Sequence, residues 1–382
     1  MCSRLGLVSC VLGLILNLFS LLPVYAQAVA DIEEAALAAY PHRQDRLILQ
    51  RSAALSPARA AEIGRLHEQL GARSLKVYSA LEGLEVVELP AGADLERSIA
   101  VYRGLAGVAK VHRDYVRRIS RTPNDTDYLN GRLWGLNNAG QQSGQIDADI
   151  DAPEAWDIRT SAGSVIVAVI DTGVRTTHED LAANMWRNPG ESGGGRENNG
   201  RDDDGNGYVD DVFGINARTN SGNPTDDNGH GTHCAGTIGA IGNNGLGVSG
   251  VAWSVQIMAL KFLSANGAGT DSDAIECIDY ARRMGAQILS NSWGGGPANS
   301  ALGVAIAATR NSGLIFVAAA GNEASDNDRV PAFPANFDFD NVVSVAATDR
   351  RDQLATFSNY GASKVDLAAP GVEIRSTWNT GD

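Results

Sequence analysis

Positive charge, cysteine and long apolar segments are all scarce in this sequence of 382 residues. It holds 31 Lys and Arg residues against 45 Asp and Glu, a net charge of −14. This balance argues against nucleic acid as a partner, because such binding needs a basic surface. No run beyond the N-terminal segment is apolar enough to span a bilayer. The overall composition, 43% apolar and 20% charged, is that of an ordinary globular protein.

The small number of cysteines and a missing glycine motif argue against two further features, a disulfide and a dinucleotide-binding site. Only four cysteines are present, and Cys2 and Cys10 lie in the N-terminal segment. Cys234 and Cys277 remain in predicted helices, where lone cysteines are typically small buried hydrophobes, so we predict no disulfide. A Gly-x-Gly-x-x-Gly fingerprint is also missing after the first apolar strand of the main domain, which disfavours a dinucleotide enzyme.

The N-terminus has the features of a targeting segment. Arg4 precedes an apolar run over residues 5–22, and Val24 and Ala26 satisfy the small-residue rule for cleavage after Ala26. We expect residues 1–26 to be a signal peptide, although an uncleaved membrane anchor is the alternative. Cleavage would leave a protein that is secreted, extracellular or periplasmic, with no membrane association.

Residues 27–122 form a first predicted unit, a small α+β sandwich. The expected elements are a strand over 46–50, a helix over 57–70, a strand pair over 74–89, a helix over 93–104 and a strand over 108–116. Ser56 is the expected helix cap. The unit holds no catalytic constellation, and we interpret His67 and His112 as surface histidines.

Beyond Asp151, apolar runs alternate with helical segments. The runs cover 165–170, 255–260, 287–289, 314–320 and 342–346, and the helices cover 230–239, 271–284 and 300–312. This alternation predicts an α/β domain with a doubly wound, mostly parallel sheet and helices on both faces. The polar segment over 117–148 is interpreted as a linker followed by a stretch packed on this domain through Trp134.

Polar residues follow three of these predicted strands, at the edge where open α/β sheets form their sites. Asp171 ends the first run, Asn322 follows the run over 314–320, and His230 opens a glycine-rich helix. An acid at a strand end and a histidine opening a helix match a Ser-His-Asp hydrolase in the order Asp, His, Ser. Asp171 would fix the tautomer of His230. The helix dipole would disfavour the imidazolium, and Asn322 could donate to an oxyanion. Each residue alone could be a turn residue.

The nucleophile is missing from this pattern. Ser358 lacks the small flanking residues of a tight strand-to-helix turn, and we interpret it as a loop residue. A triad without its serine keeps only the residual catalysis of binding and oxyanion stabilisation. We therefore expect the chain as given to be inactive.

An acidic loop over 202–211 places oxygen ligands at alternate positions around a glycine turn. This is the first part of an EF-hand-like loop, and its expected ligands for calcium are Asp202, Asp204, Asn206, the Tyr208 carbonyl and Asp210. Phe213 stands where the closing glutamate would be, so Asp211 or water would complete the shell. A solvated acidic loop is the alternative, but so many neighbouring carboxylates repel without a cation. The pattern does not suit zinc.

Three blocks of the sequence resemble the subtilisin family of serine endopeptidases. They are Asp171-Thr172-Gly173-Val174, His230-Gly231-Thr232-His233-Cys234-Ala235-Gly236-Thr237 and Ala318-Ala319-Ala320-Gly321-Asn322-Glu323. The resemblance covers 123–382 and implies a catalytic domain with Asp171 and His230 as triad members and Asn322 as the oxyanion donor. It also implies substrate binding by Ser292, Trp293, Gly294, Ala319, Ala320 and Gly321, and a second calcium site at Asp180 with the loop at 243–246.

The same resemblance implies what lies at either end of this domain. The segment over 367–372 resembles the approach to the family's nucleophile turn, so the serine is expected shortly after Asp382, and we favour an incomplete sequence over a natural truncation. Residues 27–122 are similar in element order to the family's prodomain, which would be a partner of its own catalytic domain. The expected function is cleavage of protein or peptide substrates by a secreted enzyme made as a zymogen.

Two rival functions stay open at this point. One is a catalytically inactive subtilisin-like protein that binds peptides along Ser292 to Gly294. The other is a calcium-dependent surface or structural protein that uses the acidic loop.

Overall fold

The structure is a computed structural model that describes residues 42–52, 55–78, 81, 83–116 and 121–380. The predicted signal peptide lies outside the described residues. The chain divides into two compact units, Met1–Arg118 and Ile119–Asp382. Among the described residues, no helix combines the length and the apolar character needed to cross a membrane.

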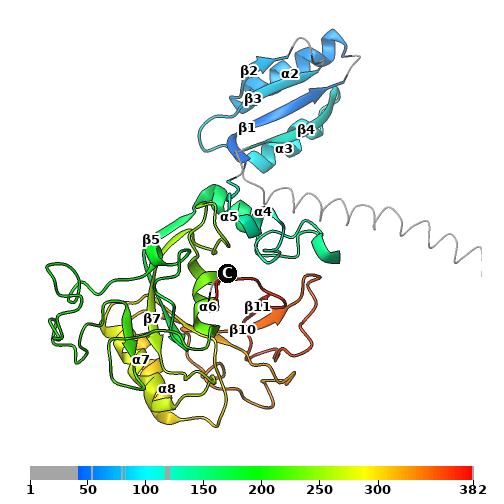
Figure 1. Cartoon of the computed structure of the whole chain (residues 1–382). Coiled ribbons are helices and arrows are strands. Elements are labelled where there is room, and N and C mark those ends of the chain that lie inside the picture. The colour runs from blue at the N-terminus through cyan, green and yellow to red at the C-terminus, as the bar shows by residue number, and fades with distance from the viewer. Residues whose placement is uncertain (1–41, 53–54, 79–80, 82, 117–120, 381–382) are drawn as a thin grey trace, which may run out of the picture. The chain divides into compact units, whose positions relative to one another are not determined.

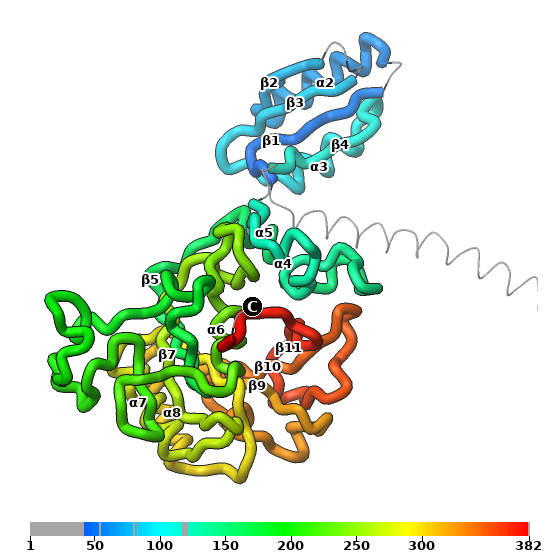
Figure 2. Tube along the Cα trace, in the orientation of Figure 1, coloured from blue at the N-terminus to red at the C-terminus, as the bar shows by residue number. Residues whose placement is uncertain are grey.

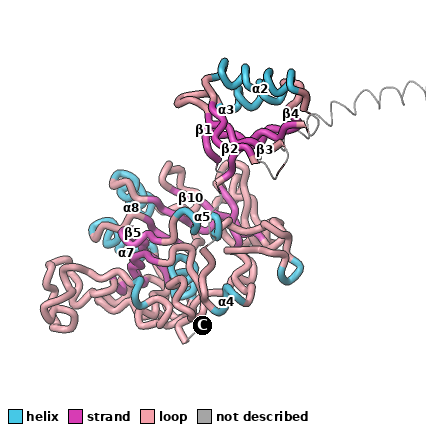
Figure 3. The backbone as a smooth tube through the Cα atoms, turned by 90° about the horizontal axis from the view of Figure 1, so that it is seen from above, coloured by secondary structure: helices cyan, strands magenta, loops and turns pink. Residues whose placement is uncertain are grey.

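The first unit has the predicted βαββαβ order. Its elements are β1 (His42–Arg51), α2 (Pro57–Leu70), β2 (Arg73–Val77), β3 (Leu84–Glu88), α3 (Leu95–Arg103) and β4 (Val108–Tyr115). The strands pair antiparallel in the order β2-β3-β1-β4. Both helices lie on one side of this sheet (Figure 3). Ser56 caps α2 as expected, because its side chain accepts the Arg59 N–H.

One expectation for this unit is wrong. His67 is not a surface histidine, since its side chain is only 12% exposed and its Nδ1 lies 2.7 Å from the Tyr102 hydroxyl. Its Nε2 lies 3.3 Å from Glu85, a buried carboxylate that Arg51 also binds. These contacts join α2 to the sheet and to α3. His112 is exposed, as predicted.

The second unit is built on a seven-stranded sheet in which all neighbouring strands pair parallel (Figure 1). The strand order is β11-β10-β9-β8-β5-β7-β6. The strands are β5 (Ser161–Asp171), β6 (Gly214–Asn216), β7 (Ser254–Lys261), β8 (Ile288–Asn291), β9 (Ile315–Ala319), β10 (Val342–Thr348) and β11 (Leu367–Pro370). The predicted doubly wound, mostly parallel sheet is thus confirmed. The short edge strands β6 and β11 were not predicted as strands.

Helices cover both faces of this sheet because successive residues of its central strand point to opposite sides. Ala168 and Ile170 of β5 pack in one core with α7 (Asp271–Arg283) and α8 (Ser300–Asn311). Val167 and Val169 pack in a second core with α6 (His230–Gly239). Both cores extend over β7, which α7 contacts (Figure 2).

The remaining elements of this unit are short. They are α4 (Thr126–Leu129), η1 (Gln141–Ser143), α5 (Ala152–Ile158) and η2 (Ala182–Asn184). Trp156 of α5 is buried against Trp253 and Tyr128. The Trp134 segment is packed on the domain, as predicted: Trp134 is 2% exposed, and its indole N–H donates to the Val372 carbonyl.

The site residues are positioned by the strand order. β5 lies between β7 and β8, so the direction in which the chain adds strands reverses next to it. Open parallel sheets form their ligand sites at the carboxyl edge of such a point. Asp171 is the last residue of β5.

Candidate active site

The structure brings Asp171 and His230 together. The Nδ1 atom of His230 lies 2.8 Å and 2.9 Å from the two carboxylate oxygens of Asp171. Asp171 is 1% exposed, whereas the His230 side chain is 49% exposed. Because Nδ1 faces the carboxylate, Nε2 lies on the opposite edge of the ring. The pair is therefore a buried acid that orients an accessible imidazole.

The pKa of His230 is raised, which is opposite to the direction expected from its place at a helix N-terminus. The first cause is the hydrogen bond to Asp171, followed by the contact with Cys234, whose Sγ lies 4.0 Å from Nδ1. A nearby anion favours the imidazolium more strongly than the partial charge of the helix end disfavours it. Cys234 is only partly buried and lies beside the candidate base, a contact that was not predicted. It lies one helical turn after His230, and this i, i+4 spacing could have revealed it.

A cleft extends on both sides of the segment Ser292–Gly296, which follows β8. One side is lined by this segment together with His230 and Thr172. The other is lined by the same segment together with Ala319, Gly321 and Asn322. The predicted base and the predicted oxyanion donor thus belong to adjoining parts of one cleft. The predicted substrate-binding residues Ser292, Trp293 and Gly294 line both parts.

Ala320 is placed differently from its neighbours in the predicted substrate-binding set. It is 1% exposed and does not line the cleft. Its carbonyl accepts hydrogen bonds from the side-chain amides of Asn327 and Asn359. Ala320 therefore packs behind the residues that line the cleft.

Asn359 anchors the turn that carries Asn322. Its side-chain Oδ1 accepts the N–H groups of Glu323 at 2.9 Å and Ser325 at 3.0 Å. Its Nδ2 lies 2.9 Å from the Glu323 carboxylate and 3.1 Å from the Ala320 carbonyl. Asn359 is 1% exposed, so this network is protected from water, while Asn322 itself is exposed. The role of Asn359 was not predicted, because 37 positions of sequence separate it from Asn322.

Ser358 is a structural residue, as its sequence context indicated. It is 2% exposed, accepts the Ala347 N–H at 2.9 Å and donates to the Asn359 carbonyl. Among the described residues, no serine hydroxyl forms a hydrogen bond with His230. Ser376 lies near α6, but it donates to the His233 carbonyl.

A cluster of acidic residues forms around the predicted metal loop, with a membership that differs from the expected one. Ligand oxygens of Glu191, Asp202 and Asp204 all lie within 4.8 Å of one another. Glu191 is fully buried, and its Oε2 has no hydrogen-bond partner. Burial raises the pKa of the Glu191 carboxyl. Glu191 was not among the expected ligands, because it precedes the loop by eleven positions and no spacing signal marks it.

Of the other ligands expected from the sequence, some lie at the acidic cluster and some do not. Asn206 stays with the cluster, because its Nδ2 contacts Asp204 and Asp211. The structure does not bring Asp210 to it: that carboxylate accepts the N–H groups of Asn199 and Gly200 instead. Tyr208 is buried, and its hydroxyl donates to Glu276 of α7.

Asp180 lies beside the loop that the resemblance implied. Its carboxylate accepts the side-chain amide of Asn244 at 2.7 Å and the Val248 N–H at 3.0 Å. Asp125, which is also buried, accepts the N–H groups of Asn243 and Asn244. Protein donors therefore already surround these two carboxylates.

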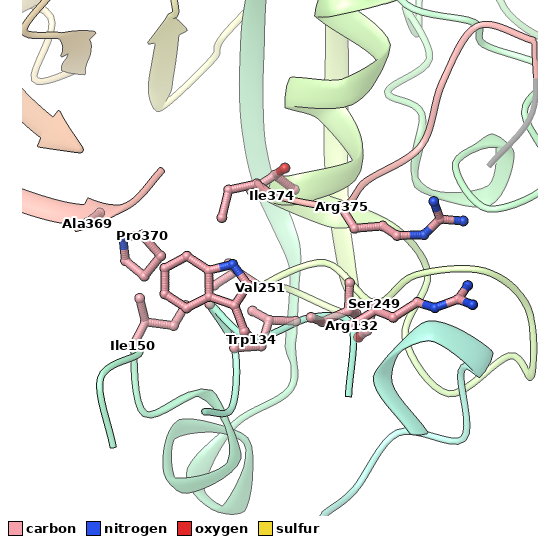
Figure 4. A pocket seen from close by; sticks show the side chains of 13 residues that line it. Arg132, Trp134, Ile150, Ser249, Val251, Ala369, Pro370, Ile374 and Arg375 are labelled. Atoms are coloured by element: carbon pink, nitrogen blue, oxygen red, sulfur yellow. The ribbon is translucent and has the colours of Figure 1, made fainter. Parts of the chain in front are cut away.

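An apolar pocket elsewhere in this unit contains none of the predicted site residues. Its walls include Trp134, Ile150 and Pro370. The side chains of Arg132 and Arg375 extend side by side at one end of it (Figure 4), and both bind Asp127.

Several known proteins are similar to this chain. Residues 162–382 match the Subtilase family, Peptidase S8. Thermitase of Thermoactinomyces vulgaris is 38% identical over 259 residues, which cover 68% of this chain and 77% of that protein. The Thermophilic serine proteinase of Bacillus sp. (strain AK1) is 36% identical over 264 residues, or 69% of this chain and 55% of that protein.

Two further matches extend these comparisons. The Extracellular protease of Xanthomonas campestris pv. campestris is 33% identical over 321 residues, which cover 78% of this chain and 51% of that protein. A solved structure of a cold adapted subtilisin-like serine proteinase is 30% identical, covers 65% of this chain and 76% of its own, and has a TM-score of 0.48. The chain thus spans about half the length of two of the curated relatives.

Proposed function

The chain belongs to the subtilase family, and from this premise we propose that it is the precursor of a secreted serine endopeptidase. The observation that carries the proposal is the contact of Asp171 with the Nδ1 edge of an accessible His230 in a cleft at the carboxyl edge of the sheet. The reaction is hydrolysis of a peptide bond in a protein or peptide substrate.

His230, Asp171 and Asn322 have different roles in this reaction. His230 takes the proton of the attacking serine through Nε2 and returns it to the leaving amine. Asp171 holds the ring in the tautomer that leaves Nε2 unprotonated and stabilises the imidazolium that forms. Asn322 donates its amide to the oxyanion. The serine belongs to a segment that follows Asp382.

The substrate lies along the segment Ser292–Gly294, whose backbone pairs with it. The residue before the scissile bond enters the part of the cleft walled by Ala319 and Gly321, with Ala320 behind it. The support for this assignment is that the same segment lines the cleft on both the His230 side and the Asn322 side.

Residues 1–26 act as the signal peptide and 27–122 as the prodomain, which assists folding and inhibits the catalytic domain over 123–382. The prodomain assignment is supported by the βαββαβ order and the antiparallel sheet of the first unit. After signal cleavage the protein is extracellular or periplasmic.

Calcium is proposed as a structural ion at the acidic cluster. Glu191, Asp202 and Asp204 supply carboxylate oxygens, the donor type that calcium prefers. The buried Oε2 of Glu191 lacks a partner among the described residues, and a bound cation would satisfy it. When bound, the ion would offset the repulsion of these carboxylates and fix the loop. The Asp180 loop remains a weaker second candidate, because its carboxylate already accepts two protein donors.

The test is peptide hydrolysis by the product of the complete reading frame. The unaltered protein should cleave casein, and His230→Ala should lower the rate by at least about 10²-fold, since general base catalysis contributes about 10² to 10⁴. The matched control is His112→Ala, an exposed histidine of the first unit whose loss should leave the rate of the processed enzyme unchanged. A folded product that binds peptides without cleaving them, or cleavage that survives His230→Ala, would overturn the proposal.

A further inference from the structure

Asp226 is a buried carboxylate that the proposed reaction does not use. It is 6% exposed, and hydroxyl and N–H donors surround it on both oxygens. Oδ1 accepts from the Thr172 hydroxyl, the Asn228 N–H and the Gly229 N–H, each at 2.9 Å. Oδ2 accepts from the Thr232 N–H at 3.0 Å and the Thr232 hydroxyl at 2.6 Å. Five protein donors thus converge on the two acceptor oxygens of one buried side chain.

The hydroxyls of Thr172 and Thr232 each accept a further hydrogen bond. The Thr172 oxygen accepts the N–H of Gly231 at 2.9 Å, and the Thr232 oxygen accepts the N–H of Arg175 at 3.0 Å. A hydroxyl that donates to the carboxylate keeps its lone pairs turned toward these N–H groups. Asp226 therefore links the loop that leaves β5 to the first turn of α6 by two separate routes.

These two segments carry the catalytic pair. Thr172 directly follows Asp171, and its N–H donates to the Asp171 carboxylate at 2.7 Å. His230 stands between Gly229, whose N–H Asp226 accepts, and Gly231. The segments approach so closely that a side chain on Gly231 would meet the Gly173 carbonyl at 2.1 Å. A small shift of either segment would change the distance between the carboxylate and the imidazole.

Asp227, the residue after Asp226, also helps to hold the loop that leaves β5. Asp227 binds the ammonium group of Lys261, which is 2% exposed and pairs in register with Asp171. That ammonium also donates to the Thr172 carbonyl at 2.6 Å. Thr172 is thus held through its side chain by Asp226 and through its carbonyl by Lys261.

We propose that Asp226 is a positioning residue that sets the hydrogen bond between Asp171 and His230 while contacting neither of their side chains. This inference rests on the proposed catalytic role of the pair, and it makes a separate prediction for the geometry of the pair. It also accounts for the N-terminus of α6, where Gly229 offers no capping side chain and Asp226 accepts the Thr232 N–H in its place.

The test uses the full chain with nitrogen-15 in its histidines and follows the Nδ1 proton and the pH titration of His230 by NMR. The groups that face this ring are Asp171, Cys234 and, more remotely, His233. In Asp226→Asn, the amide NH₂ must face either the Thr232 donors or the donors at Oδ1. We expect the downfield Nδ1 proton signal to disappear and the pKa of His230 to fall by about one unit or more, as its ion pair loosens.

Controls separate this inference from the proposed function. Asp340→Asn makes the same change at an exposed carboxylate paired with Arg310 and should leave the His230 spectrum unchanged. Asp171→Asn should abolish the signal; if it does not, the catalytic pair itself is refuted. If Asp171→Asn abolishes the signal and a folded Asp226→Asn keeps both the signal and the pKa, the pair stands and the positioning role of Asp226 is refuted.

A second pair of variants serves if Asp226→Asn does not fold. Thr232→Val removes one donor and one route, so the His230 pKa should fall partway and the Nδ1 proton should exchange faster with water. Thr232→Ser keeps the hydroxyl and should restore both values. A folded Thr232→Val protein that matches the unaltered chain in both measurements would contradict the inference.

Discussion

Replacing Glu191 by glutamine should change the stability of the second unit in opposite directions with and without calcium. Glu191 is fully buried, with one carboxylate oxygen unpartnered, and its ligand atom lies within 4.8 Å of those of Asp202 and Asp204. Without a cation, the Glu191 carboxylate lowers the free energy of unfolding, because it repels the neighbouring carboxylates. With calcium bound, the same carboxylate is a ligand and raises the free energy of unfolding.

The cost follows from Coulomb's law. Two like charges no more than 4.8 Å apart repel by at least about 3 kcal/mol at an effective dielectric constant of about 20. Asp204 is exposed and Asp202 partly so, and solvent screening reduces this value. We therefore expect Glu191→Gln to raise the free energy of unfolding by about 1 kcal/mol in a chelator.

The gain follows from binding linkage. Free calcium at about 100 times its dissociation constant stabilises a protein by about 2.7 kcal/mol. Loss of one ligand that weakens binding about tenfold lowers this increment to about 1.4 kcal/mol. Glu191→Gln should thus lose about half of the stabilisation that calcium gives the unaltered chain.

Urea unfolding with chelator and with calcium measures both quantities. The matched control is Asp210→Asn, a member of the ligand set expected from the sequence, whose carboxylate binds the N–H groups of Asn199 and Gly200 instead. It should lower stability equally in both conditions and keep the calcium increment. The reasoning is refuted if Asp210→Asn abolishes the increment and Glu191→Gln leaves it intact.

Three further predictions concern the active site. Asp171 raises the pKa of His230. The pair therefore contributes stability that is fully present below about pH 6.5, the ordinary pKa of histidine, and that is lost as the pH rises through the raised pKa. Asp171→Asn should flatten this pH dependence of the melting temperature. Asn359→Ala should lower the free energy of unfolding by about 2 to 3 kcal/mol, because it leaves buried donors and acceptors unpaired; an effect below about 0.5 kcal/mol in urea unfolding would contradict this. Gly231→Ala should lower the melting temperature strongly, because its Cβ would meet the Gly173 carbonyl, whereas Gly64→Ala, with open space around it, should not.

Elements with a strong local signal could be predicted from the sequence. The helix predicted over 230–239 begins and ends at those residues in the structure, because glycine and polar residues mark its start. The central strand β5 is apolar on both faces and could be recognised as buried. The edge strands β6 and β11 could not, since they are only three and four residues long and carry no periodicity.

Contacts between distant segments were beyond the sequence. The pattern of alternate oxygens favoured Asp210 as a ligand, but its φ of 52° and its bonds to Asn199 and Gly200 direct it elsewhere. Glu191 joins the cluster by tertiary folding alone. The direction of the His230 pKa shift was missed for a similar reason: its helix end was visible in the sequence, but the strength of its bond to Asp171 was not.

The most direct measurement of the central claim is covalent labelling of the complete gene product with a fluorophosphonate, which reacts with an activated serine. We expect mass spectrometry to find the label on one serine that follows Asp382, and we expect His230→Ala to abolish the reaction. Labelling of Ser358, or labelling that persists without the His230 imidazole, would contradict the account.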